Sequence, residues 1–96
     1  MNMNMLMQQA QKMQKDLQKA QAEIESQTFT SKQDLVEVEV QGNKKVNKVK
    51  INENINSDDI EILEDMIVLA INDCLNQIDK KMEEKLGKFK GIPGLF

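Results

Sequence analysis

Lysine side chains recur at helical spacing near both ends of the chain. Each set steps by three or four residues: Lys12, Lys15 and Lys19 near the start, and Lys81, Lys85 and Lys88 near the end. Because a helix turns every 3.6 residues, each set lines one side of a helix. A lysine ammonium group acts as a point charge toward phosphate and carries little base information. The spacing predicts two positive lines suited to a phosphate backbone, although a plain solvated helix face has the same pattern.

Two glutamines accompany the first set of lysines. Gln8 and Gln11 could pair with adenine edges, but exposed glutamine on a helix is usually only polar surface. We therefore place both residues in the candidate interface as minor members.

Charge is distributed unevenly along the chain, whose 96 residues carry a net charge of −3. Residues 57–75 contain six acids and no lysine. By contrast, residues 1–22 contain three lysines and one acid, and residues 76–96 contain five lysines and three acids. The two ends are locally basic, which favours a polyanionic partner there.

Residues for catalysis or metal binding are sparse. The chain has no His, no Arg and a single Cys, and it has no glycine-rich phosphate loop. Cys74 lies on an apolar helix face without the His partner that a thiol nucleophile usually needs, so a structural role is predicted. The asparagines of residues 52–56 have calcium-loop spacing, but Ser57 and Leu63 replace the required Gly and Glu. We expect no catalytic site, metal, cofactor or small-molecule substrate.

The first set of lysines requires a long helix over about residues 3–26. Its apolar residues step by 3, 4, 3, 4, the a/d repeat of a coiled-coil seam: Met3, Leu6, Ala10, Met13, Leu17, Ala20 and Ile24. The lysines occupy the opposite face. We expect the seam to pack on the second helix through Leu6, Met13 and Leu17 against Ile78, Met82 and Leu86. Whether this packing is within one protomer is left open.

Short strands are predicted at about residues 28–30, 35–41 and 45–52. Alternation of Val with Glu indicates a half-buried second strand, and the polar residues 31–34 are expected to end the first. Gly42 and Asn43 tolerate positive φ and predict a hairpin turn. Val46 is out of phase with the apolar residues after it, which indicates a bulge or a strand end.

The second helix is expected over about residues 58–89, with Ser57 as its N-cap. Residues 66–71 are six consecutive apolar residues, wider than one buried stripe requires. A sheet on one side and a second copy on the other would cover such a segment. We therefore predict a homodimer, also involving the apolar face of residues 36–40, with these interface residues: Leu63, Met66, Ile67, Ala70 and Ile71.

Taken together, residues 1–96 are predicted to form one α+β domain. It has a long N-terminal helix, a small antiparallel sheet of two to three strands, a long C-terminal helix and a tail at 90–96. Three Phe and no Trp or Tyr make the core aliphatic, so dimerisation would add burial to a small core. The longest apolar run is far short of the roughly 18 residues that span a bilayer. The start lacks the basic region of a signal peptide, and the single Cys fits a reducing cytosol, so we expect a cytoplasmic protein without membrane contact.

The order of elements, the segment 63–73 with its Leu-Glu-Asp-Met-Ile start, and the closing Gly-Ile-Pro-Gly-Leu-Phe together resemble one known family. This is the YbaB/EbfC family of bacterial nucleoid-associated proteins. Residues 7–14 also resemble the first helix of that family. The resemblance covers nearly the whole chain. It implies a homodimeric protein that binds double-stranded DNA, with two projecting helical arms and roles in nucleoid organisation and gene regulation. Because Arg makes the bidentate contact to guanine, its absence here predicts weak sequence selectivity.

A chaperone is the alternative interpretation. A long helix, a hairpin and another long helix also resemble the subunits of prefoldin, whose coiled-coil arms hold unfolded chains. The broad apolar segment 66–71 argues against a plain two-stranded arm. Titration with duplex DNA at low salt would distinguish the two functions.

Overall fold

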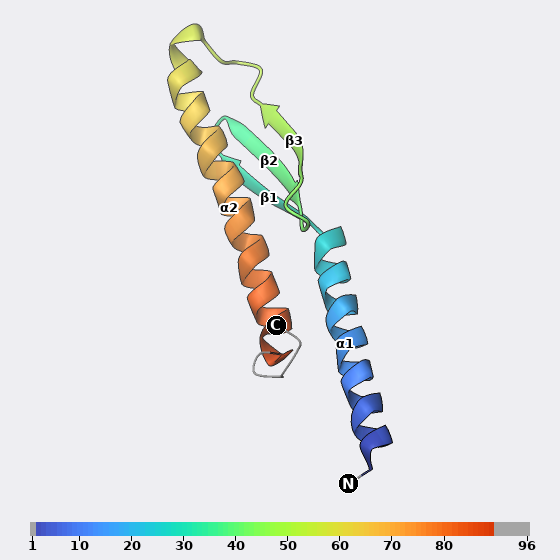
Figure 1. The fold of residues 1–96 in the computed structure, drawn as a ribbon. Coiled ribbons are helices and arrows are strands. Elements are labelled where there is room, and N and C mark those ends of the chain that lie inside the picture. Colours follow the sequence, from blue (N-terminus) through green and yellow to red (C-terminus); the bar gives the residue numbers. More distant parts are fainter. Residues whose placement is uncertain (1, 90–96) are drawn as a thin grey trace.

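The computed structural model describes residues 2–89, apart from the side chain of Lys88, as a rod of 70 × 19 × 14 Å (Figure 1). The elements follow in this order: α1 (Met3–Ser26), β1 (Thr28–Gln33), β2 (Val36–Gln41), β3 (Val46–Ile51), a 3-10 turn (Ser57–Asp59), α2 (Ile60–Leu86) and a second 3-10 turn (Gly87–Phe89). The predicted α+β order of helix, antiparallel sheet and helix is confirmed. The tail predicted at 90–96 lies outside the described residues.

α2 runs along the sheet and then beside α1, and α1 continues past the end of α2 (Figure 1). The rod therefore has a sheet half, where α2 packs on the strands, and an arm half, where α2 lies beside α1. Within the described part of the chain, neither helix has a stretch long and apolar enough to cross a membrane.

The sheet has the strand order β1-β2-β3, and both pairings are antiparallel. In the β2–β3 pair, Glu39 lies opposite Lys48 but Val40 lies opposite Val46, so Asn47 is an extra residue in β3. This irregularity confirms the bulge that the phase of Val46 predicted.

β1 is longer than the sequence predicts, because it continues through the polar residues 31–33. Ser31 is buried opposite Val38, and Gln33 pairs with Val36 across a two-residue turn. Asp34 takes a φ of 47° in that turn, a value that Asp tolerates. Pairing with the valine strand therefore overrides the polarity of these residues.

The turn between β2 and β3 lies where it was expected, but for a different reason. The residue with positive φ is Lys44, at 70°, whereas Gly42 and Asn43 do not take positive φ. The turn is therefore where Gly42 and Asn43 predicted it, although neither residue uses its tolerance of positive φ.

Gly42 is needed because the hairpin passes directly beneath the end of α1. A Cβ at Gly42 would collide with the backbone carbonyl of Ile24. The N–H of Gly42 donates to the carbonyl of Gln27 at 2.8 Å, and Gln41 Nε2 donates to the carbonyl of Glu25 at 3.2 Å. These contacts attach the hairpin to the base of α1.

The start of α2 also differs from the prediction. Ser57 opens a 3-10 turn instead of capping the helix. The Asn56 N–H donates to the Asp59 carboxylate at 3.0 Å, and the Asp59 N–H donates to the Asn56 carbonyl at 2.9 Å. Asn56 rather than Ser57 therefore occupies the N-cap position of this turn, and the Asp59 carboxylate at N3 returns to its backbone as in a capping box.

The main core lies between α2 and one face of β1 and β2. Alternation puts every second residue of β2 on this face, and spacing of three, four or seven residues brings one stripe of α2 onto it. The buried members are Val36, Val38, Val40, Leu63, Ala70, Cys74 and Ile78. Each fully buried large aliphatic side chain contributes roughly 1.5–3 kcal/mol. The sheet therefore covers one side of the apolar segment in α2, as expected.

A second, smaller core joins α1 to α2 within one protomer. Leu17, Leu86 and Phe89 are buried there, and Ala20 and Met82 pack against them. The seam prediction is thus correct for Leu17, Met82 and Leu86. It is wrong for Ile78, which belongs to the sheet core, while Leu6 and Met13 are exposed and do not pack on α2 within the protomer.

Candidate nucleic-acid interface

The first lysine line lies on the solvent side of α1. The helix begins after Asn2, whose side chain accepts from the Asn4 N–H at 3.0 Å. Lys12, Lys15 and Lys19 are all exposed, on the face opposite the packed Leu17. Gln8 and Gln11 are exposed as well. Because the apolar seam lies on the opposite face of α1, all three ammonium groups point to solvent.

The second lysine line lies on the part of α2 that runs beside α1. Lys81 is half-buried and Lys85 is exposed in the last turn, where a positive charge interacts favourably with the helix dipole. The side chain of Lys88, the third predicted member, lies outside the described residues. Both lines therefore belong to the arm half of the rod, away from the start of α2 (Figure 1).

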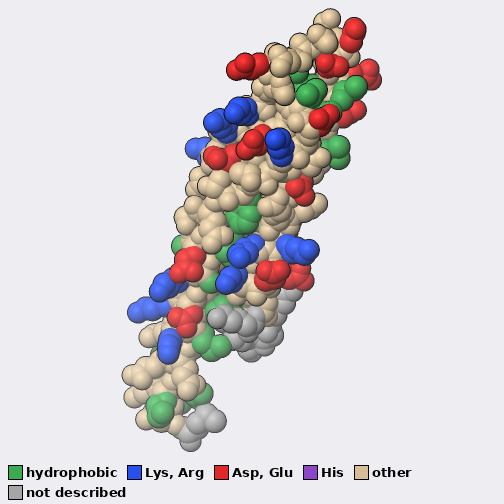
Figure 2. All heavy atoms as spheres, turned by 180° about the vertical axis from the view of Figure 1, so that it is seen from behind, with side chains coloured by type: hydrophobic (Ala, Val, Ile, Leu, Met, Phe, Trp, Pro, Cys, Tyr) green, Lys and Arg blue, Asp and Glu red, His purple; other side chains and the backbone are tan. Residues whose placement is uncertain are grey.

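Acidic residues concentrate at the other end of the rod. Six carboxylates lie between residues 57 and 75, which form the first 3-10 turn and the first half of α2. Figure 2 shows acidic side chains gathered at that end and lysines along the arm, where some acids are interspersed. This asymmetry would orient a polyanion toward the arm.

The densest run of lysines in the chain was not among the predicted site residues. Lys44, Lys45, Lys48 and Lys50 lie within seven residues that contain no acid, and all four are exposed. The four closely spaced lysines are visible in the sequence, but a search for helical spacing does not detect them. In the structure, nearby acidic side chains partly neutralise their charge. Lys44 pairs with Asp79 at 3.2 Å, and Lys48 and Lys50 lie opposite glutamates of β2.

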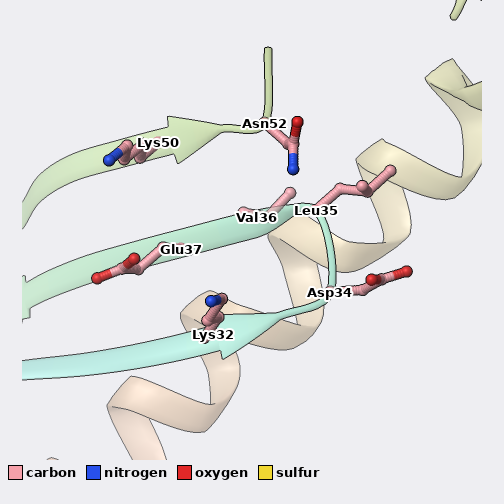
Figure 3. Close-up of a pocket in the computed structure, with 7 residues that line it drawn as sticks. All are labelled: Lys32, Asp34, Leu35, Val36, Glu37, Lys50 and Asn52. Carbon is pink, nitrogen blue, oxygen red and sulfur yellow. The ribbon is translucent and has the colours of Figure 1, made fainter. Parts of the chain in front are cut away.

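A shallow hollow of about 190 Å³ lies at one end of the sheet (Figure 3). Lys32 and Lys50 flank it together with Asp34 and Glu37, and Asn52 borders it. Because two lysines and two acids surround the hollow, it favours neither an anionic nor a cationic ligand. No cluster of metal-ligating side chains occurs among the described residues.

An apolar surface remains uncovered beside the main core. Val46, Val49 and Ile51 lie opposite Val40, Val38 and Val36 and so face the same side of the sheet, yet they are 43%, 41% and 38% exposed. On α2, Val68 and Leu69 are 57% and 59% exposed. α2 covers β1 and β2 and leaves the β3 part of this face open.

The predicted dimer residues divide into two groups in the protomer. Leu63 and Ala70 are buried against the sheet of their own chain. Met66, Ile67 and Ile71 are half-buried at the border of the core. The second group keeps accessible surface, whereas the first has almost none.

Cys74 is a core residue. Its Sγ lies 3.6 Å from the carbonyl oxygen of Phe29 and 3.7 Å from that of Val38. Burial raises the pKa of the thiol, and the neighbouring Asp73 carboxylate raises it further. A thiol with a raised pKa is a poor nucleophile at neutral pH, which agrees with the structural role predicted for it.

The chain is thus an elongated α+β rod with a lysine-lined helical arm and an acidic opposite end. The sequence pattern of the YbaB/EbfC DNA-binding family matches residues 1–92, and the chain belongs to this family.

Several relatives carry the name nucleoid-associated protein. One from Lactococcus lactis subsp. cremoris (strain MG1363) is 50% identical over 97% of this chain and 98% of its own. Another from Streptococcus thermophilus (strain CNRZ 1066) is 47% identical over 95% of each chain, and one from Streptococcus pneumoniae (strain Hungary19A-6) is 45% identical over the same share.

Proposed function

We propose that this protein is a homodimeric nucleoid-associated protein that binds double-stranded DNA through the lysine lines of its arms. The observation that carries the proposal is the position of Lys12, Lys15 and Lys19, exposed together on the side of α1 opposite Leu17. They span roughly 10 Å along the helix, about three base-pair steps of a duplex. Lys81 and Lys85 on α2, with Lys88 in the turn after it, form a second line proposed to contact phosphates, and Gln8 and Gln11 lie beside the first line.

The chemistry of these residues supports binding with weak sequence selectivity. Lysine contacts to phosphate fix the position of a protein on DNA but do not read bases. The chain contains no Arg, which provides the commonest specific contact, to guanine. Affinity should therefore depend mainly on counterion release and fall steeply with salt.

The uncovered apolar surface supports a homodimer. Val46, Val49 and Ile51 on β3 and Val68 on α2 are too exposed for a well-buried core, and a second copy packed on them would complete it. Met66, Ile67 and Ile71 are half-buried at the border of the main core and are the remaining candidates for contacts across the dimer. Leu63 and Ala70 would support the interface from within each protomer.

Family membership and the names of the relatives support a cytoplasmic location at the nucleoid. We infer roles in nucleoid organisation and gene regulation, without catalysis and without a cofactor. The acidic end of α2 would point away from the DNA, because its carboxylates repel phosphate.

One observation favours the chaperone alternative: apolar seam residues of α1, including Leu6 and Met13, are exposed. Both functions are tested by titrating a labelled short duplex with the protein at low salt, and by measuring in parallel whether the protein suppresses aggregation of an unfolded client. DNA binding without suppression supports the proposal. Suppression without DNA binding at low salt contradicts it in favour of the chaperone.

A further inference from the structure

The first half of α1 carries an apolar seam beyond the contact with α2. The packed cluster reaches Leu17, whereas Met3, Leu6 and Met13 are 74%, 46% and 36% exposed and Ala10 is also exposed. The repeat of three and four residues continues unchanged through this segment. The free seam is therefore a continuation of an interface that is already packed further along the same helix.

The free seam is self-complementary when two copies run antiparallel. Met3 and Ala10 occupy a positions, and Leu6 and Met13 occupy d positions. An antiparallel pair places Met3 against Met13 and Leu6 against Ala10, and both pairs are symmetric about the level of Gln8. A large side chain thus meets a small one in the central layers, and flexible Met fills the outer layers. In a parallel pair, the two α1 helices would also meet at Leu17, where each already packs on its own α2. The two α2 helices would then compete for the same space.

Charges do not oppose this pairing. Residues 2–11 carry no charge, and the flanking e and g positions from Met7 to Gln14 are also uncharged. Lys12, Lys15 and Lys19 lie at c and f positions, which face away from the seam. Two arms joined by their seams would therefore present lysine lines on two opposite outer sides.

We propose that the α1 seam at residues 3–13 is a docking site for the same segment of a second copy, packed antiparallel, so that each pair of arms can join two DNA duplexes. The contact lies at the other end of the rod from the β3 surface assigned to the homodimer. The pairing itself rests only on the seam, whereas the joining of duplexes rests on the proposed DNA-binding function. Four short layers make a weak contact, so pairing increases where DNA concentrates the protein.

Disulfide trapping tests the pairing without DNA. Leu6→Cys and Ala10→Cys proteins are oxidised with diamide separately and as a mixture, with wild type as the control because Cys74 is buried. The antiparallel arrangement predicts that the mixture forms more cross-linked product than either variant alone. Equal or greater cross-linking of Leu6→Cys with itself, or no cross-linking above wild type, overturns the proposal.

A capture assay tests the joining of duplexes. Bead-bound duplex and protein are mixed with a second, labelled duplex, and Leu6→Gln is compared with Met5→Gln, a neighbouring exposed residue off the seam. Leu6→Gln should capture about tenfold less labelled duplex, since polar groups disfavour a seam position, while its affinity for a single duplex stays at the wild-type value. Met5→Gln should capture as wild type does.

Two results separate the failures of the two proposals. Capture by Leu6→Gln equal to wild type overturns the role of the seam in joining duplexes. Failure of the wild type to bind even a single duplex refutes the proposed function, and the disulfide result then still decides whether the arms pair.

Discussion

Replacing Lys12, Lys15 and Lys19 together with glutamine should remove the α1 contribution to DNA binding and leave the fold intact. All three side chains are exposed on the face opposite Leu17, so no packed contact is lost. Glutamine is about as good a helix former as lysine, so α1 should persist. Circular dichroism and thermal melting of the variant should match the wild type.

The expected effect follows from counterion release. Each phosphate contact contributes roughly −0.9 to the slope of log K against log salt, so three contacts contribute about −2.7. Over a fourfold change of salt, from 50 to 200 mM, a slope of that size corresponds to roughly 40-fold in affinity. For each arm engaged, the wild type should therefore lose about 40-fold more affinity than the variant over this range.

Fluorescence anisotropy of a labelled duplex across a salt series measures both slopes. The matched control replaces Lys32, Lys48 and Lys50 with glutamine, an equal loss of charge on the exposed outer face of the sheet. A slope in the α1 variant equal to that of the wild type refutes the assignment. An equal change in both variants would mean that net charge, and not the α1 line, governs binding.

Three further substitutions, two of them with a matched control variant, test the packing of the protomer and the proposed dimer interface. Leu17→Ala should lower the free energy of unfolding by about 2–5 kcal/mol, since Leu17 is 6% exposed. The control Leu6→Ala should change it by less than about 0.5 kcal/mol. Equal losses of unfolding free energy in urea melts would mean that Leu6 is also in a packed core. Gly42→Ala should destabilise by about 1–3 kcal/mol or more through overpacking against α1, and a melt unchanged from wild type would contradict the close approach. Val49→Asp should dissociate the proposed homodimer in analytical ultracentrifugation because a charge would be buried in the interface. Lys48→Asp, on the other face of β3, should leave the dimer intact. If the Val49→Asp protein is still a dimer, the interface does not include this face of β3.

Periodicity predicted the elements whose packing is repetitive. The seam through Leu17 and Ile24 identified α1, and the Val–Glu alternation identified β2, because a buried face repeats at the period of its own element. The end of the α1–α2 contact could not be predicted in the same way. The seam continues unchanged through Met13 and Leu6, and only the three-dimensional position at which α2 ends leaves them exposed.

Features that depend on contacts between distant segments were also missed. Gly42 has the local signature of a turn residue, but its real constraint is the backbone of Ile24, 18 positions earlier in the chain. The length of β1 depends on its pairing with β2, which no local property of residues 31–33 encodes. In the candidate interface, the helical lysines were predictable from their spacing, whereas the partial neutralisation of the hairpin lysines by Asp79 and the β2 glutamates required the fold.

The attachment of the hairpin to the base of α1 makes the arm a lever. The hydrogen bonds from Gly42 to Gln27, the residue after the helix, and from Gln41 to Glu25 in its last turn hold the base of α1 at the sheet. α1 has 24 residues, and the part before Leu17, residues 3–16, extends roughly 21 Å beyond the contact with α2. A tilt of α1 by about 10° would displace its tip relative to this contact by roughly 4 Å, close to one base-pair step of a duplex. A small change in the orientation of α1 at its base would therefore be larger at the end of the arm. In the proposed homodimer, the spacing between the two arm tips would depend on the sheet as well as on the arms.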